Sequence, residues 1–233
     1  MRKNQVFDLL PTLARNVSPN IVFMINNPSG PDEYTRALGR ERVMLGFVFG
    51  GGRREGDIIR AIIPKSRWLK TPFGEIDGSD TPRLRSLLTI LRKSGFHVEA
   101  CRNIVEWQAT HAAMVPVMAI PLMKHGLNAK ALAKSEADLD LMVDAMRDTL
   151  DVLEALGVKV TPRSQSIIRH IPKFILRPLI RAALPSRFME VGGVWHVSQA
   201  GDEMDQLAKE LGEMVDKSAL EVPALKRLLD RNF

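Results

Sequence analysis

A strand-like run that ends in polar turn residues is the first segment of the chain with the character of a ligand site. Residues 20–30 read NIVFMINNPSG, so an apolar run rich in β-formers stops at two asparagines, a proline and a glycine. Polar residues at the end of a strand commonly hold ligands in α/β proteins. The segment NNPSG is therefore a candidate ligand-binding turn, although an asparagine before Pro-Ser-Gly can also serve only as a turn former.

The remaining reactive side chains form no recognised catalytic or metal-binding pattern. No H-E-x-x-H, Cys/His cluster or G-x-S-x-G motif is present. No two histidines stand at a spacing that places them on one helix face; they occupy positions 97, 111, 125, 170 and 196. The sequence therefore gives no support to a metal site or to nucleophilic catalysis.

A glycine-rich segment, FGGGRREG at residues 49–56, invites comparison with a phosphate loop. It has neither the G-x-x-x-x-G-K-[ST] order nor a G-x-G-x-x-G that opens a helix. We therefore predict a flexible hairpin loop there.

Composition describes an ordinary globular protein. The chain has 233 residues, 45% of them hydrophobic, which suffices for one large or two small domains. It contains neither an apolar run of roughly 18 to 20 residues nor the features of a signal peptide. Its single cysteine, Cys101, excludes an internal disulfide, and we interpret it as a small core residue rather than a redox group. These features predict a cytoplasmic protein.

Charge is distributed unevenly along the second half. Seven acids and one base lie between Glu136 and Glu154, whereas Ala155 to Met189 holds seven bases and no acid. Apolar residues interleave with the bases of residues 159–187, as on a membrane-surface or anion-binding face. Prolines at 172, 178 and 185 instead favour short helices packed on the body with a solvated basic face.

Hydrophobic periodicity predicts an α/β part over residues 1–102 and an all-helical part over 103–233. In the first part it predicts helices over 4–16 and 82–94, and strands over 21–25, 42–49, 57–63 and 97–101. In the second part it predicts a proline-kinked helix over 103–125, a helix after Gly201 and a helix at the C-terminus. It also predicts a helix that begins at Ser135, with Asp138 as the partner in its capping box, and that ends at Gly157.

Four segments in this order resemble the ketopantoate reductase (2-dehydropantoate 2-reductase) family. They are NNPSG at 26–30, LGRERVMLGF at 38–47, FGEIDGSDTPRL at 73–84, and the late helix and proline from Glu203 to Pro223. The resemblance implies a partial Rossmann-type NADP-binding domain followed by a helical C-terminal substrate domain. Its opening strand and G-x-G-x-x-G turn have no counterpart before Asn20, so the sequence is expected to begin inside that domain.

The resemblance also implies a reaction and the residues that perform it. Family members reduce 2-dehydropantoate, or a related 2-keto acid, with NADPH in a cleft between the two domains. Asn27 and Gly30 would then lie at the cofactor and substrate, Glu75 would contact the cofactor, and no metal would be needed. Glu203 would bind the hydroxyl end of the substrate, since a carboxylate accepts from a hydroxyl. A glutamate in a helix's first turn can also merely favour the helix dipole.

One departure from the family concerns the proton donor. The family places a catalytic lysine two residues after a tryptophan, and asparagines at four-residue steps beyond it. In WQATHAAMVPV the lysine position is Ala109, and the asparagine positions are Ala113 and Val117. Alanine cannot neutralise or protonate the alkoxide that hydride transfer to a ketone creates. Thr110 or His111 could substitute, but on a helix they point about 100° and 200° away from position 109.

Three functions therefore remain open. The first is an NADPH-dependent reductase of a small 2-keto acid. The second is a catalytically impaired relative that acts as a binding or interaction protein. The third is a peripheral anionic-membrane or anion-binding module that uses residues 159–187. Since the strand at 21–25 would expose an unpaired edge, we also expect a homodimer or self-association through that edge.

Overall fold

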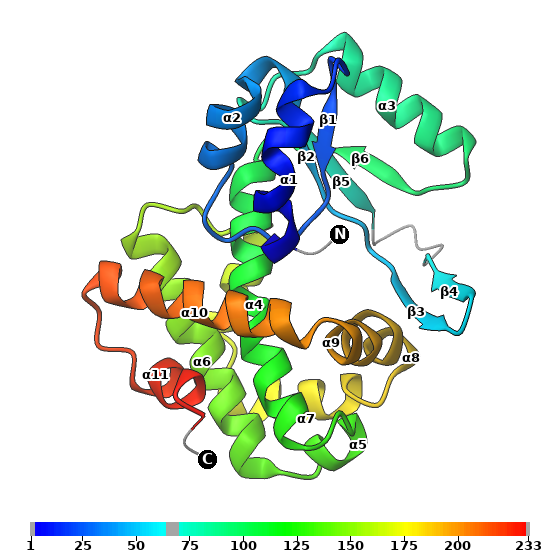
Figure 1. Ribbon diagram of the computed structural model, residues 1–233. Coiled ribbons are helices and arrows are strands. Elements are labelled where there is room, and N and C mark those ends of the chain that lie inside the picture. The colour runs from blue at the N-terminus through cyan, green and yellow to red at the C-terminus, as the bar shows by residue number, and fades with distance from the viewer. Residues whose placement is uncertain (1–2, 64–69, 232–233) are drawn as a thin grey trace. The chain divides into compact units, whose positions relative to one another are not determined.

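The computed structural model describes residues 3–63 and 70–231, with only the backbone of Arg53. The chain divides into two compact units. The first, here called the sheet unit, comprises residues 1–50 and 63–109. The second, here called the helical unit, comprises residues 51–62 and 110–233. Figure 1 labels their helices and strands.

A mixed four-stranded sheet forms the centre of the sheet unit. Its strands are β1 (Ile21–Phe23), β2 (Val43–Gly46), β5 (Thr71–Glu75) and β6 (Val98–Ala100), in the order β1-β2-β5-β6. β1 and β2 run parallel, with Phe23 opposite Leu45, whereas β5 pairs antiparallel with β2 and parallel with β6. β1 therefore forms one edge of the sheet in the part of the chain that the structure describes.

Helices cover both faces of this sheet. They are α1 (Lys3–Arg15), α2 (Asp32–Leu38) and α3 (Pro82–Lys93), with a 3₁₀ turn at Arg40–Arg42. One face packs on α1 and α2, and there the Phe23 and Tyr34 rings stack with centroids 4.4 Å apart. The other face packs on α3 through Phe73, Leu84 and Leu88. This is the layered α/β architecture expected from the sequence, with mixed rather than purely parallel strands.

Two elements of the sheet unit escaped prediction. β5 reads TPFGE, and its proline and glycine are residues typical of turns, yet every residue of the strand is buried. The strand forms because β2 and β6 pair with it on both sides. α2 is a seven-residue helix, too short to show a clear apolar period.

The helical unit is built around α4, α6 and α10. Its helices are α4 (Ile104–Lys124), whose first residues to Ala109 belong to the sheet unit, α5 (Ala129–Leu132), α6 (Glu136–Ala155), α7 (Lys173–Ala183), α8 (Arg187–Met189), α9 (Trp195–Gln199), α10 (Gly201–Ser218) and α11 (Pro223–Leu229). A 3₁₀ segment, η2 (Arg163–Arg169), and a π-helical segment, η3 (Glu190–Val194), connect them. The short pieces between residues 163 and 199 agree with the expectation from the prolines.

α6 forms as its sequence predicts. The Ser135 hydroxyl accepts a hydrogen bond from the Asp138 N–H and begins the helix, and Gly157 follows its end with a φ of 76°. The predicted apolar stripe is buried in the core of the unit; its members are Leu139, Val143, Met146, Leu150 and Leu153.

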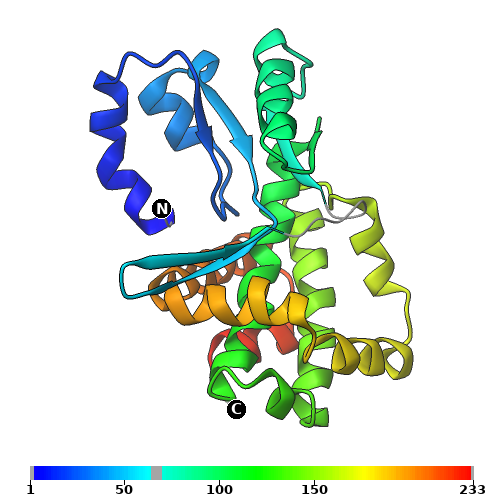
Figure 2. The same ribbon diagram turned by 90° about the vertical axis from the view of Figure 1, so that its right-hand side faces the viewer.

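The prediction of a flexible loop over residues 49–56 was wrong. Gly51–Glu55 is a strand, β3, that pairs antiparallel with β4 (Ile58–Ile62). β3 contacts α9 and η3 in the helical unit, and the hairpin can be followed in Figure 2. A Cβ at Gly51 would lie 1.9 Å from the Val191 carbonyl oxygen, so the glycine permits this close packing.

None of the helices within residues 3–63 and 70–231 is long and apolar enough to cross a bilayer.

Candidate functional site

Asn27 and Gly30 form one turn beyond the carboxyl end of β1. The Asn27 side chain is only 1% exposed, and its Nδ2 donates a 2.7 Å hydrogen bond to the Gly30 carbonyl oxygen. Gly30 has a φ of 82°, a conformation that favours glycine, and a Cβ there would meet no atom within 4 Å. The turn is thus held by its own asparagine, at the end of the sheet where α/β proteins bind ligands.

Gln108, on the first turns of α4, joins the ends of the two parallel strands. Its Nε2 donates to the carbonyl oxygens of Phe23 at 3.3 Å and Gly46 at 2.7 Å, and the residue is 2% exposed. Sequence analysis missed this residue. The available signal was a lone amide in the otherwise apolar stretch IVEWQATHAAMV, which did not indicate what it contacts.

Both amides have a buried oxygen without a hydrogen-bond partner among residues 3–63 and 70–231. These atoms are Asn27 Oδ1 and Gln108 Oε1. A buried polar atom left unsatisfied costs about 1–3 kcal/mol, so such an atom in a folded protein calls for an explanation. Both nitrogens are engaged with backbone carbonyls, which fixes the remaining oxygens as acceptors. A ligand that offers N–H or O–H donors to this end of the sheet would satisfy them.

A buried lysine side chain contacts the same turn. Lys3 is 2% exposed, and its Nζ donates to the Ser29 hydroxyl at 3.4 Å. Ser29 lies between Asn27 and Gly30, so α1 anchors the turn through this contact.

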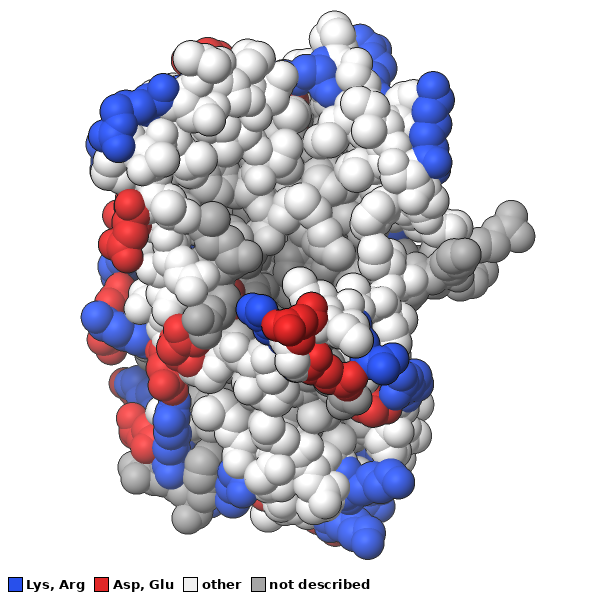
Figure 3. Space-filling model, turned by 45° about the vertical axis from the view of Figure 1, so that its right-hand side comes forward, with Lys and Arg blue, Asp and Glu red and all other residues white. Residues whose placement is uncertain are grey.

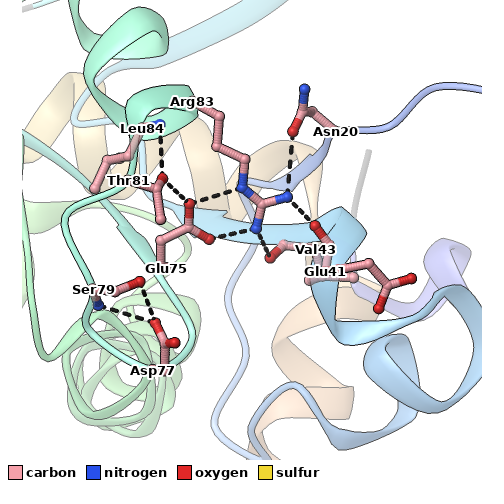
Figure 4. A network of polar contacts seen from close by, with 9 residues as sticks. All are labelled: Asn20, Glu41, Val43, Glu75, Asp77, Ser79, Thr81, Arg83 and Leu84. Atoms are coloured by element: carbon pink, nitrogen blue, oxygen red, sulfur yellow. Dashed lines mark hydrogen bonds and ion pairs between the residues drawn. The ribbon is translucent and has the colours of Figure 1, made fainter.

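Glu75 lies at the opposite end of the sheet. It pairs with Met44 near the amino ends of β1 and β2, whereas Asn27 follows their carboxyl ends. Its carboxylate accepts from Arg83 at 2.8 Å and 2.5 Å, and from the Thr81 hydroxyl (Figure 4). The Arg83 guanidinium in turn donates to three oxygens, those of the Asn20 side chain and the Glu41 and Val43 carbonyls.

This network explains the electrostatics of Glu75. Burial alone would raise the pKa of its carboxyl, but the hydrogen bonds from Arg83 and Thr81 outweigh burial and lower that pKa. The charge of the glutamate is therefore compensated within the sheet unit. The structure does not bring Glu75 together with Asn27, and its contact with a cofactor stays a prediction.

Glu203 lies in the first turn of α10, in the helical unit. Its side chain is 3% exposed, and its Oε2 is 3.6 Å from Nε2 of His196 on α9. His111, on α4, lies close enough to His196 to be affected by its charge. Burial, together with that neighbouring charge, lowers the pKa of His111 to about 4, so its imidazole is neutral at pH 7.

The other positions singled out on α4 carry no functional group toward solvent. Ala109, Ala113 and Val117 are all buried. Thr110 is fully buried, and its hydroxyl accepts a 3.1 Å hydrogen bond from the Thr161 N–H. Among the substitutes considered for Ala109, Thr110 is thus engaged in holding the segment that follows α6.

The basic stretch and the acidic stretch pair with one another. Lys173 contacts Asp144 at 2.5 Å, Arg177 contacts Asp140 at 3.4 Å and Glu136 at 3.7 Å, and Arg181 contacts Glu136 at 2.9 Å. Arg169 likewise binds Asp151 and Glu154 of α6. We call these pairs the α6–α7 ion-pair row. Figure 3 shows Lys and Arg side chains intermixed with Asp and Glu on the face it draws. The predicted solvated basic face is therefore largely neutralised by α6.

Neither a protein-family model nor a curated protein sequence matches the chain. Solved structures do match it over 99% of its length. D-mandelate dehydrogenase, in a ternary structure with NADH and anilino(oxo)acetate, matches with a TM-score of 0.72 at 13% identity. The 2-dehydropantoate 2-reductase of Methylococcus capsulatus matches with 0.72 at 15%, and a dimeric ketopantoate reductase of Staphylococcus aureus with 0.66 at 12%. The chain covers 70 to 73% of these three proteins' lengths.

These matches define the fold. The chain has the architecture of the ketopantoate reductases, with an α/β nucleotide-binding type of unit and a helical unit. That agrees with the resemblance drawn from the sequence. At identities of 12 to 15% the likeness concerns the fold, and the chemistry must be argued from this chain's own residues.

Proposed function

We propose that the protein is an NAD(P)H-dependent oxidoreductase that reduces a small 2-keto acid, with 2-dehydropantoate as the first substrate to test. The fold supports a nicotinamide-dependent reaction. The observation that carries the proposal is a pair of buried acceptors, Asn27 Oδ1 and Gln108 Oε1, at the carboxyl ends of β1 and β2. Neither has a hydrogen-bond partner within the part of the chain that the structure describes. That is the position at which open α/β sheets hold ligands.

The residues present suit the sugar and carboxamide parts of a nicotinamide nucleotide. Ribose hydroxyls and a carboxamide N–H₂ are donors, which two orphaned acceptors require. Asn27 and Gln108 would accept from them, Gly30 would keep the turn open, and the Lys3 ammonium would favour the anionic nucleotide. The bound nucleotide would supply the hydride. NADPH rather than NADH is the cofactor that the sequence resemblance favours, and Glu75 remains its predicted further contact.

Glu203 offers a buried carboxylate that can accept from a substrate hydroxyl. The Staphylococcus aureus relative in fold is described as dimeric, and we keep self-association through the β1 edge as part of the proposal. A cytoplasmic location likewise stays a prediction.

A second function has one observation in its favour. Position 109, where the resemblance places a lysine, carries a methyl group that is 4% exposed. It cannot donate a proton to a substrate. A protein with the acceptors of the sheet unit but no proton donor would bind a nicotinamide nucleotide without turnover.

The binding part of the proposal is tested by Asn27→Ala against Asn20→Ala. Asn20 is the matched control because it precedes β1 at the opposite end of the same strand and is exposed. Loss of one hydrogen bond is worth about 0.5–1.5 kcal/mol, so we expect Asn27→Ala to weaken NADPH binding roughly tenfold and Asn20→Ala to leave it unchanged. Titration calorimetry with NADPH and with NADH measures both.

Turnover is measured separately from the loss of absorbance at 340 nm with 2-dehydropantoate and other 2-keto acids. Tight nucleotide binding with no turnover of any 2-keto acid would favour the binding protein over the enzyme. The proposal fails if the wild-type chain binds neither nucleotide, or if both asparagine variants bind equally well.

A further inference from the structure

A cavity of about 430 Å³ lies at the carboxyl ends of β5 and β6, and all of its lining residues belong to the sheet unit. Small-molecule sites typically enclose about 300–1,000 Å³. Three segments line the cavity: residues 78–80 after β5, one stripe of α3, and residues 100–102 at the end of β6. α3 packs against both strands (Figure 1). Because β5 and β6 run parallel, this is a second place where the carboxyl ends of neighbouring strands meet, as at ligand sites of α/β sheets.

Two glycines bring the segments around this cavity together. A Cβ at Gly78 would lie 2.6 Å from the Arg102 carbonyl oxygen, and a Cβ at Gly74 would collide with that of Cys101. Gly78 also has a φ of 76°, a conformation that favours glycine. The walls of the cavity are therefore set by close backbone packing.

The lining of the cavity is positively charged. It contains three guanidiniums, those of Arg85, Arg92 and Arg102, against one carboxylate, that of Asp80, so its net charge is +2. Arg85 and Arg92 are two turns apart on α3 and share one stripe of that helix. Their contacts are long: Arg85 Nη1 lies 3.4 Å from Asp80 Oδ2, and Arg92 Nη2 lies 3.5 Å from the Val98 carbonyl oxygen. Each guanidinium carries five N–H donors, so most of them remain available to a ligand.

The floor of the cavity is apolar and uncharged. Leu84 and Leu88 are buried there, and Cys101 is half-buried beside them. Burial raises the pKa of the Cys101 thiol, and the nearby Glu99 and Glu106 raise it further, so the thiol is protonated at pH 7. These two glutamates do not line the cavity. The site thus combines an apolar floor with a cationic rim.

We propose that this cavity binds a small organic phosphate, with the phosphate on the guanidiniums and the organic part on the leucine floor. A phosphate monoester carries about −1.5 to −2 charges at pH 7, which balances the charge of the lining, whereas a single carboxylate would balance half of it. The guanidinium fork also matches two phosphate oxygens at once. Since β5 is antiparallel to β2, the cavity lies at the end of the sheet opposite Asn27 and is separate from the proposed nicotinamide site.

Titration calorimetry of the whole chain with phenyl phosphate tests this site. Phenyl sulfate has the same shape with a single negative charge, and inorganic phosphate lacks the apolar part. We expect phenyl phosphate to bind more tightly than either. Equal affinity for phenyl sulfate would overturn the assignment of a dianion, and equal affinity for inorganic phosphate would overturn the assignment of an organic phosphate.

Four variants locate the bound probe. Arg92→Gln and Arg102→Gln each remove hydrogen bonds to a charged group, so we expect each to weaken phenyl phosphate binding roughly ten- to a hundredfold. Asp80→Asn should strengthen binding, because it removes the one negative charge of the lining. Arg36→Gln is the matched control, since Arg36 is an exposed arginine of α2, on the other face of the sheet. Equal affinities of the wild type and both cavity arginine variants would overturn the inference.

A second readout reports occupancy of the cavity directly. Cys101 is the one cysteine of the chain and lines the cavity, so alkylation by iodoacetamide, followed by mass spectrometry, reports on this position alone. We expect phenyl phosphate to slow the alkylation in the wild type and in Arg36→Gln, and the same concentration to have less effect in Arg92→Gln. The inference is overturned if the wild type binds no phenyl phosphate, or if saturating phenyl phosphate leaves the alkylation rate unchanged.

Discussion

The two units each bury a glutamate that the sequence singled out, and the two glutamates are held in opposite ways. Glu75 in the sheet unit has a guanidinium and a hydroxyl on its carboxylate, and its partner Arg83 is itself bound to backbone carbonyls. Glu203 in the helical unit contacts a histidine at 3.6 Å. The first partner is a guanidinium that donates hydrogen bonds directly to the carboxylate, whereas the second is an imidazole at a longer distance.

This contrast teaches that burial alone does not mark a functional carboxylate. Both side chains are at most 5% exposed. The partner separates them: Glu75 is hydrogen-bonded to a guanidinium, and Glu203 lies 3.6 Å from an imidazole. Asp138 resembles Glu75 in this respect. Burial would raise its pKa, but hydrogen bonds from Lys124, His125 and Ser135 lower it to about 2.

The largest effect should come from breaking the Glu75 pair. Arg83→Ala leaves a buried carboxylate without its cation, and we expect the free energy of unfolding to fall by about 3 kcal/mol, somewhat less than for a fully buried pair because Arg83 is a quarter exposed. Urea denaturation followed by circular dichroism measures this change.

Arg85→Ala is the control for that measurement. Arg85 pairs with Asp80 on the surface, where a pair is worth about 0–1 kcal/mol. Equal destabilisation by the two variants would show that Glu75 is not held as described. NADPH affinity, measured on Glu75→Gln, tests the predicted cofactor contact: unchanged affinity assigns Glu75 to stability alone.

A smaller effect should appear as pH dependence of the helical unit. The pKa of His111 in the fold is about 4, below its ordinary value of 6.5. Above pH 6.5 the residue is neutral in both states. As pH falls from 6.5 to 4, the unfolded chain takes up a proton that the folded chain does not, so stability declines by about 2 kcal/mol, since His111 is only partly buried.

His111→Gln should flatten this decline, and urea denaturation at pH 7.0, 5.5 and 4.5 compares its slope with that of the wild type. His170→Gln is the matched control because His170 is an exposed histidine of the same unit. An identical slope in wild type and His111→Gln would contradict the lowered pKa of His111.

The smallest effect is expected at the α6–α7 ion-pair row. Its members are a third or more exposed at several positions, and such pairs contribute about 0–1 kcal/mol each. The triple variant Lys173→Ala, Arg177→Ala, Arg181→Ala should therefore lose little stability, and the loss should shrink further in high salt.

The same triple variant tests the membrane-surface function. Because the cations are engaged by α6, we expect no co-sedimentation of the wild type with vesicles containing 30% phosphatidylserine at physiological salt. The membrane-surface function would be supported if the wild type binds these vesicles, the triple variant loses that binding, and Lys130→Ala keeps it.

Much of the fold followed from local patterns. α6 was predicted with its cap because Ser135, Asp138 and the apolar stripe lie within a few turns of one another along the chain. The strands around residues 21–25, 57–63 and 97–101 were confirmed, though each is shorter than predicted. β5 and the glycine strand β3 were not predicted, because they contain residues typical of turns. These residues form strands through pairing with neighbouring strands.

Of the candidate site, Asn27 and Gly30 could be chosen from the sequence because a strand end and its turn are adjacent along the chain. Gln108 could not, since its partners at Phe23 and Gly46 lie 85 and 62 positions away. His196 gave no signal either, because a lone histidine in VWHVSQ has no pattern of its own.

The sequence by itself determined what depends on short range: the α/β and helical parts, the caps, the apolar stripes and the order of motifs that resembles the ketopantoate reductases. Tertiary structure alone decided which charges meet. It paired Glu75 with Arg83, acids of α6 with bases of α7, and Glu203 with His196. The reason is physical: periodicity reports which face of an element is buried, but the partner of a buried polar group depends on how distant elements pack.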